Sequence, residues 1–142
     1  MQNITSGQYL NLNKFAVGLI NQVREQLGLP KIILNQDSMD IAKEVADTYK
    51  AKNEILAGHD PKGVTTPIAE KHGLYAFPEN ISYLVGNDRK TYTMDFVKEN
   101  IYEQILDMLF EDNYTTNAAY GHAANFLTNN ATTKSKDIDG NE

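Results

Sequence analysis

Hydrophobic positions near the N-terminus recur at the spacing of an α-helix. Counted from Leu12, they fall at i, i+3, i+4, i+7, i+8, i+11 and i+15, so that the last is Leu27. This spacing places one apolar stripe along a helix that begins at about Tyr9. Gly28 suits the left-handed position after a helix end, and Pro30 prevents the helix from continuing. The pattern therefore predicts an amphipathic helix that ends at Leu27.

The same spacing predicts further helices, separated by loop-forming residues. They span about residues 38–52, 66–73, 93–110 and 118–127. Asp37 or Ser38 is expected to cap the first of these, and Thr66 with Pro67 to open the second. The other segments are predicted as loop over 58–63, extended chain over 74–84, polar loop over 111–117 and a polar tail or turn over 129–142.

Composition narrows the classes of protein that the chain can represent. It has 142 residues, of which 41% are hydrophobic and 23% charged, as in a single globular domain. A net charge of −6 without a run of Lys or Arg predicts no general binding of nucleic acid. No apolar run approaches the roughly 20 residues of a membrane span, and residues 1–8 show no signal peptide. The absence of cysteine excludes disulfides, thiolate nucleophiles and cysteine-based zinc sites.

The histidines are the first candidates for chemistry. His59 lies in a Gly-His-Asp-Pro loop directly after an apolar helix, where a rigid scaffold often presents functional side chains. His122 opens or lies inside a short helix, and a half-buried structural histidine is the alternative there. His72 precedes Gly73 at a helix end, where we expect only a structural or surface role, since a cation is favoured at that end of the helix dipole.

Among the acids, Glu79 stands out by its surroundings. It lies in an apolar stretch between Phe77 and Tyr83, where an unpaired carboxylate would be costly to desolvate. A histidine is the natural partner for such a group. Glu111 and Asp112 follow the long helix, at the end that disfavours anions, so they are either exposed or held there for a ligand.

Four short segments stand out when they are taken in order. They are Asn21-x-x-Arg24-x-x-x-Gly28-Leu29-Pro30, Gly58-His59 after an Ala-containing helix, Glu79-Asn80-Ile81, and Gly121-His122-Ala123-Ala124-Asn125-Phe126-Leu127. As a set they resemble the CAP/SCP superfamily of cysteine-rich secretory, antigen and pathogenesis-related proteins. Together they cover about residues 10–130. The stretch 101–127 is similar to CAP modules of Gram-positive surface proteins, including the surface-exclusion type, and the lack of cysteine suits that bacterial branch.

The resemblance implies an α+β fold, the α-β-α sandwich of CAP domains. We expect the CAP-like domain over residues 9–128, a linker or disordered N-terminus over 1–8, and a tail over 129–142 that leads to missing final strands. The object should therefore be helix-rich with an incomplete sheet, as in a piece of a larger surface protein. Two departures from the family pattern are Pro78 before Glu79 and the absence of tryptophan from the long helix.

The resemblance also implies a cleft with two histidines and two acids. The matching residues are His59, Glu79 and His122, with Glu111 as the fourth member and Asp112 as its alternative. Family members can hold a divalent ion on the histidines, so Zn²⁺, Mg²⁺ or Ca²⁺ on His59 and His122 is the expected cofactor.

Two functions follow from this cleft, both for an extracellular module at the cell surface or wall. The first is a non-catalytic module that binds a wall polymer or a partner protein. The second is a metal-assisted hydrolase of peptide, glycan or phosphodiester with His59, Glu79, Glu111 and His122 as its catalytic residues. Glu79 would then act as general base or orient a histidine, and Glu111 would be the second acid.

Overall fold

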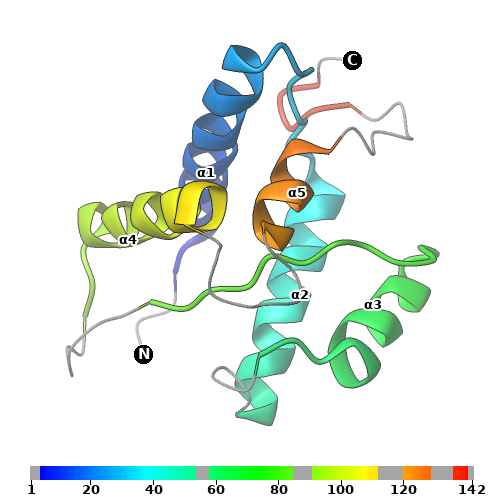
Figure 1. Ribbon diagram of the computed structural model, residues 1–142. Coiled ribbons are helices and arrows are strands. Elements are labelled where there is room, and N and C mark those ends of the chain that lie inside the picture. The colour runs from blue at the N-terminus through cyan, green and yellow to red at the C-terminus, as the bar shows by residue number, and fades with distance from the viewer. Residues whose placement is uncertain (1–3, 54–57, 85–90, 112–119, 129–135, 141–142) are drawn as a thin grey trace. The chain divides into compact units, whose positions relative to one another are not determined.

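The computed structural model describes residues 4–53, 58–84, 91–111, 120–128 and 136–140. Its elements in chain order are α1 (Ser6–Gln26), α2 (Gln36–Lys52), the π-turn η1 (Pro61–Thr65), α3 (Thr66–Lys71), α4 (Met94–Leu106), the π-turn η2 (Asp107–Glu111) and α5 (Gly121–Leu127) (Figure 1). They form two compact units. Unit 1 comprises Met1–Leu34 and Leu84–Lys134, and unit 2 comprises Asn35–Tyr83 and Ser135–Glu142.

The first helix ends as the sequence predicts but begins earlier. Thr5 is its N-cap and forms a capping box with Gln8, in which each side chain accepts a hydrogen bond from the backbone N–H of the other. This polar first turn lies outside the apolar stripe, so the predicted start at Tyr9 is late. The helix consequently includes three residues of the linker predicted over 1–8. Gly28 adopts a φ of +69°, as expected after a helix end.

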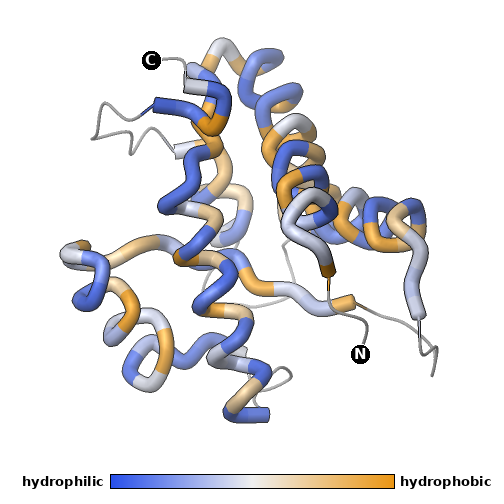
Figure 2. Tube along the Cα trace, turned by 180° about the vertical axis from the view of Figure 1, so that it is seen from behind, coloured by the Kyte–Doolittle hydropathy of each residue, from blue (hydrophilic) through white to orange (hydrophobic). Residues whose placement is uncertain are grey.

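The core of unit 1 lies where α1 meets α4, η2 and α5. Ile20, Ile105 and Leu109 are its buried residues. The partly buried residues packed on them are Ala16, Leu19, Val23, Ile32, Ile101, Phe126 and Leu127. Figure 1 shows α4 lying across α1, and Figure 2 shows hydrophobic and hydrophilic residues alternating along both helices. The long helix predicted over 93–110 thus exists, but its last turn is the wider π-turn η2.

Arg24 ties three segments of unit 1 together from an almost fully buried position, with 2% of its surface exposed. Its Nε donates to the carbonyl of Pro30 at 2.7 Å, and its Nη1 donates to the carbonyls of Phe126 at 2.7 Å and Thr128 at 3.1 Å. The last two carbonyls belong to the C-terminal end of α5, where a cation is favoured. Arg24 therefore fixes the short helix that carries His122.

Asn21, one turn earlier on α1, holds the chain that follows the helix. Its amide group exchanges two hydrogen bonds with the backbone of Ile32, at 3.0 Å from Nδ2 to the carbonyl and 2.8 Å from the backbone N–H to Oδ1. The Asn21-x-x-Arg24 pattern thus has a structural explanation, because both side chains anchor the backbone of the connector after α1.

Unit 2 begins at α2, whose cap differs from the prediction. Asn35 is the N-cap, and its Oδ1 accepts from the backbone N–H of Ser38 at 2.8 Å. Ser38 Oγ in turn accepts from the Asn35 backbone N–H at 3.3 Å. The predicted caps, Asp37 and Ser38, were wrong because Ser38 is the third helical residue of this capping box, not the residue before the helix.

The segment predicted as loop over 58–63 already begins to coil at Pro61. Asp60 caps the π-turn η1, since its Oδ1 accepts from the backbone N–H of Gly63 at 2.8 Å. The turn continues directly into α3, so Thr65 precedes that helix without a side-chain cap, and Thr66 is its first residue instead of its N-cap. Gly73 follows the helix with a φ of +70°, as predicted.

The core of unit 2 lies between α2, η1 and α3. Its buried residues are Tyr49, Val64 and Ile68. The partly buried residues packed on them are Ile41, Val45, Phe77 and Ile81. The last two come from the segment predicted as extended chain, which is neither helix nor strand in its described residues 74–84.

The helix-rich character predicted for the chain is confirmed, while its sheet is not. Across the described ranges the structure contains helices, turns and loops but no β-strand. The α+β sandwich therefore stays a prediction. The polar loop from Asp112 to Asn117 and most of the tail over 129–142 lie outside the described residues. None of the described helices is long and apolar enough to cross a membrane.

Candidate functional site

His59 and Glu79 form the polar contact on which the candidate site is built. His59 Nδ1 lies 2.6 Å from Glu79 Oε2. The Glu79 side chain is 12% exposed and the His59 side chain 45%. Glu79 thus has the histidine partner that its apolar surroundings predict. The result is a largely buried carboxylate that orients a half-exposed imidazole.

Glu79 is placed by the apolar residues on either side of it. Phe77 and Ile81 pack on the core of unit 2, so the chain between them is held against α2 and α3. Pro78, a departure from the family pattern, has no N–H to donate to a sheet. Because no strand occurs here among the described residues, this proline breaks no ladder hydrogen bond.

His59 is placed by a tight turn and the cap that follows it. Gly58 has a φ of +84°, a conformation that glycine adopts without strain. Asp60, which follows His59, caps η1 with its side chain. The same side chain pairs with Lys52 of α2, at 2.6 Å between Oδ2 and Nζ. The loop that carries His59 is therefore attached to α2 and η1 immediately after the histidine.

Tyr49 is the member of this network that the sequence analysis missed. Its ring is buried, and its hydroxyl donates to Glu79 Oε2 at 3.3 Å and accepts from the backbone N–H of Asp60 at 2.9 Å. Burial raises the pKa of Tyr49 above its ordinary value of 10.0, and the negative charge of Glu79 raises it further, against the opposing effect of the Asp60 N–H. The hydroxyl therefore keeps its proton at neutral pH and can donate it.

The other two predicted site residues belong to unit 1. His122 is half-buried in the first turn of α5, and Glu111 is exposed as the last residue of η2. Asp112, the alternative to Glu111, lies outside the described residues. The structure thus brings His59 and Glu79 into contact, and the parts of His122 and Glu111 in the set stay predictions.

Among the described residues, no group of three or more His, Asp or Glu side chains that could hold a metal ion occurs. The His59–Glu79 pair supplies only two potential ligands, and the Nδ1 of the histidine already faces the carboxylate. A divalent ion on His59 and His122 therefore stays a prediction.

His72 has the structural role predicted for it, with a partner that the sequence did not indicate. It is the C-cap residue of α3, and its Nε2 lies 2.8 Å from Glu44 Oε2 on α2. Lys71 Nζ pairs with the other oxygen of Glu44 at 2.6 Å. The hydrogen bond with His72, followed by that with Lys71, holds the pKa of Glu44 below its ordinary value of 4.5. This cluster fastens α3 to α2.

Glu44→Gln should weaken the dependence of stability on acid pH. Because the folded pKa of Glu44 is lowered, its carboxylate stabilises the folded chain above the unfolded value of 4.5. That contribution is lost as the pH falls through the lowered pKa. We expect a flatter profile of unfolding free energy below about pH 5 than in the unmodified chain, measured by urea unfolding. Glu70→Gln on α3 is the matched control, and parallel profiles for Glu44→Gln and the unmodified chain would contradict the assignment.

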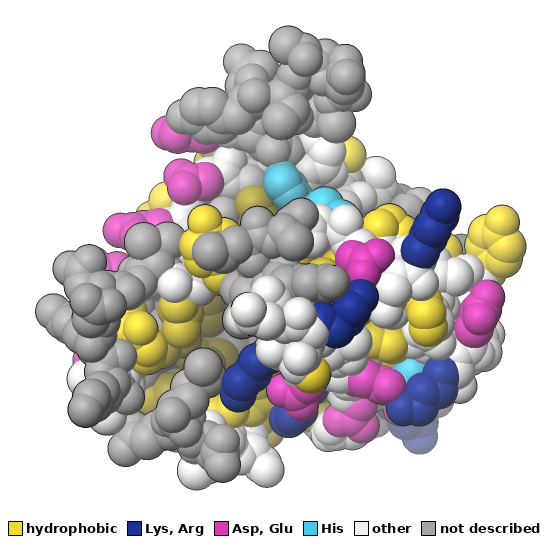
Figure 3. All heavy atoms as spheres, turned by 90° about the horizontal axis from the view of Figure 1, so that it is seen from below, with side chains coloured by type: hydrophobic (Ala, Val, Ile, Leu, Met, Phe, Trp, Pro, Cys, Tyr) yellow, Lys and Arg dark blue, Asp and Glu magenta, His cyan; other side chains and the backbone are white. Residues whose placement is uncertain are grey.

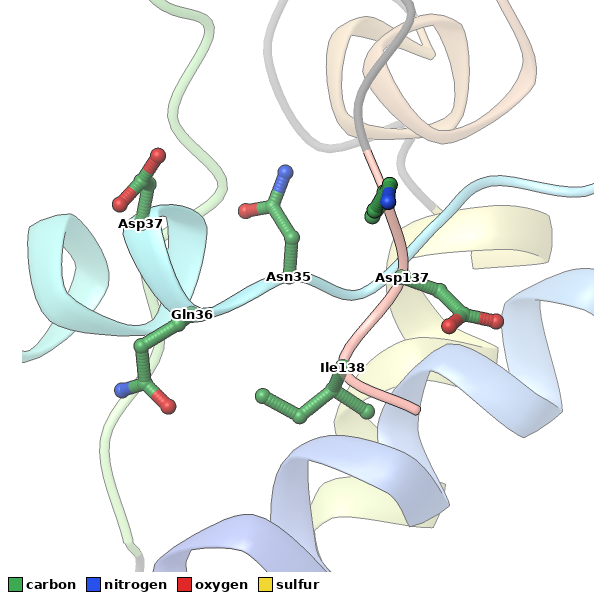
Figure 4. A pocket seen from close by; sticks show the side chains of 6 residues that line it. Asn35, Gln36, Asp37, Asp137 and Ile138 are labelled. Carbon is green, nitrogen blue, oxygen red and sulfur yellow. The ribbon is translucent and has the colours of Figure 1, made fainter. Parts of the chain in front are cut away.

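A pocket of about 310 Å³ lies elsewhere in unit 2, where the tail meets the start of α2. It is lined by Asn35, Gln36, Asp37, Lys136, Asp137 and Ile138. Figure 4 shows Ile138 directed toward Gln36, whereas Asp137 points away from α2. None of the predicted site residues lines this pocket, so it adds nothing to the candidate site.

Charged side chains on unit 2 are arranged in pairs of opposite sign. Ion pairs join Lys43 to Asp47, Lys52 to Asp60, and Lys71 to Glu44. Figure 3 likewise shows basic side chains next to acidic ones on the face it presents. No broad surface of positive charge is visible on that face, in agreement with the acidic net charge.

The family model described as CAP, the cysteine-rich secretory protein family, matches residues 17–134. No curated protein and no solved structure matches the chain significantly. The matched range contains His59, Glu79, Glu111 and His122, as well as the anchors Asn21 and Arg24.

Proposed function

We propose that this chain, which belongs to the cysteine-rich secretory protein (CAP) family, is an extracellular module that binds a cell-wall polymer or a wall-borne protein. Proteins of this family are generally secreted. The similarity of residues 101–127 to Gram-positive surface modules supports a bacterial surface protein as the parent. The observation that carries the proposal is the His59–Glu79 contact.

The chemistry of this pair suits ligand recognition. With Glu79 ionised, Nδ1 of His59 donates to the carboxylate, and Nε2 of the neutral ring then carries the lone pair. The carboxylate fixes both the tautomer and the direction of the ring, at the cost of its own desolvation. A half-exposed imidazole held in one orientation can recognise the hydroxyl and amide groups in which wall glycans and peptides are rich. His122 and Glu111 are the further proposed members of the set.

Binding to purified Gram-positive cell walls tests the proposal. Co-sedimentation should retain the unmodified chain, and His59→Ala should weaken binding by about tenfold or more, as for a central contact residue. His122→Ala tests the second proposed histidine. His72→Ala is the matched control, because His72 serves the α2–α3 contact and should leave binding unchanged. Walls treated with protease distinguish the polymer from a wall-borne protein. Equal binding by His59→Ala and the unmodified chain would overturn the proposal.

A metal-assisted hydrolase is the second candidate, favoured by one observation. A histidine that is oriented by a largely buried carboxylate, as His59 is by Glu79, can take up and release a proton in general acid–base catalysis. Release of soluble fragments from peptidoglycan, protein or DNA should then occur with added Zn²⁺, Mg²⁺ or Ca²⁺. The double variant His59→Ala with His122→Ala is the blank. Release equal to this blank would eliminate the hydrolase and leave the binding module.

A further inference from the structure

Tyr49 closes a ring of hydrogen bonds around the candidate site. We propose that Tyr49 is a positioning residue, whose hydroxyl fixes the direction of the His59 imidazole by holding Glu79 on one side and the backbone after His59 on the other. The inference rests on the proposed function for its biological meaning, since that function assigns ligand contact to His59. Its structural content can be tested independently.

The ring of hydrogen bonds includes the backbone between His59 and Asp60, which are adjacent in the sequence. From His59 the backbone leads to the Asp60 N–H, which donates to the Tyr49 oxygen at 2.9 Å. The Tyr49 hydroxyl donates to Glu79 Oε2 at 3.3 Å, and the same oxygen faces His59 Nδ1 at 2.6 Å. The Tyr49 hydroxyl therefore holds the backbone directly after His59 and, through Glu79, the imidazole of His59. A rotation of the imidazole would require one of these contacts to break.

The burial of Tyr49 restricts the movement of its hydroxyl group. The residue is 3% exposed and packs with Val64 and Ile68 in the core of unit 2. A buried tyrosine ring has little freedom to move, because a protein core is close-packed. Tyrosine also supplies one donor and an acceptor on the same atom, which this arrangement requires. The raised pKa of Tyr49 agrees with a hydroxyl that stays protonated next to a carboxylate.

Asp60 is itself held in place by two contacts of its side chain. Asp60 pairs with Lys52 and caps η1 at the Gly63 N–H, so the direction of its own N–H is set. A Cβ at Gly63 would collide with the Asp60 carboxylate and the Lys52 amine. The absence of a side chain at Gly63 therefore allows this close approach.

Tyr49→Phe isolates the hydroxyl, because the ring and its packing are retained. The readout is the tautomer of His59, measured by long-range ¹H–¹⁵N NMR at about pH 9, where an ordinary histidine is neutral. We expect the Nδ1–H form to dominate in the unmodified chain, and the ratio of the Nε2–H form to it to rise about fivefold in Tyr49→Phe. Tyr75→Phe is the matched control, since it removes a hydroxyl from a fully exposed tyrosine. The same ratio in Tyr49→Phe and the unmodified chain would overturn the inference.

A second measurement covers the case in which Tyr49→Phe does not fold. Hydrogen exchange of the Asp60 amide in the unmodified chain should be slowed, because Tyr49 accepts its hydrogen bond. Exchange at the rate of an unstructured peptide would refute this ring of hydrogen bonds.

Cell-wall binding separates the two proposals. Tyr49→Phe should weaken it about fivefold. If the unmodified chain itself does not bind walls, the proposed function fails, while the tautomer still decides the role of Tyr49.

Discussion

Arg24→Met should lower the free energy of unfolding by about 3–5 kcal/mol. Arg24 is buried and donates to the carbonyls of Pro30, Phe126 and Thr128. Each hydrogen bond from a charged group contributes about 1.5–3 kcal/mol, and the contributions are not additive. A methionine of similar length fills the space but leaves the three carbonyls without this donor. Urea unfolding followed by circular dichroism measures the loss.

Two further variants serve as comparisons for Arg24→Met. Arg24→Lys keeps the charge but lacks the planar fork, so its loss should be smaller than that of Arg24→Met. Lys31→Met removes an exposed cation, whose pair with Glu25 has an N–O distance of 3.7 Å, and should change stability by less than about 1 kcal/mol. A loss below about 1 kcal/mol for Arg24→Met would contradict the anchoring role of Arg24.

Ile68→Ala should destabilise the chain by about 2–5 kcal/mol and loosen the candidate site. Ile68 is 5% exposed in the core of unit 2, where Phe77 and Ile81 pack on either side of Glu79. A cavity at this position removes part of the surface that holds the Glu79 segment. Urea unfolding gives the stability, and hydrogen exchange of the Ile81 amide reports the segment. Ile33→Ala is the control, because it removes the same atoms from a side chain that is 47% exposed. Equal losses for the two variants would argue against this core.

Helix ends were predictable where local residues determine them. Gly28 and Gly73 mark the ends of α1 and α3 through their left-handed conformation, which is a property of glycine itself. Helix starts were less predictable. The caps Thr5 and Asn35 act through reciprocal hydrogen bonds with residues three positions on, and many polar residues near a helix start could form such bonds.

The candidate site was predictable where burial demands a partner. Glu79 lies among apolar residues, so its pairing with a histidine followed from the cost of desolvation. Tyr49 was missed because it occupies the apolar face of α2, where a phenylalanine would give the same pattern. Its hydroxyl was the available signal, since a buried tyrosine usually has a hydrogen-bond partner. The role of Arg24 could not be derived, because two of its acceptors lie 102 and 104 positions away.

The sheet is the part of the prediction that rests on the family and not on local pattern. Residues 74–84 have the composition of an extended segment, and their described backbone is non-helical. A strand, however, needs a neighbour to satisfy its backbone hydrogen bonds. Composition alone does not supply that neighbour, so the sheet stays a prediction from the family resemblance, whereas the helices are confirmed.

NMR titration with soluble fragments of Gram-positive cell wall would show whether the proposed ligand contact is the His59–Glu79 pair. We expect the ring signals of His59 to shift during the titration, and Glu79→Gln to weaken the apparent affinity by about tenfold. Glu70→Gln, an exposed change of the same type, should leave the affinity unchanged. The claim would be contradicted by saturable binding that leaves the His59 signals in place, or by equal affinity of Glu79→Gln and the unmodified chain.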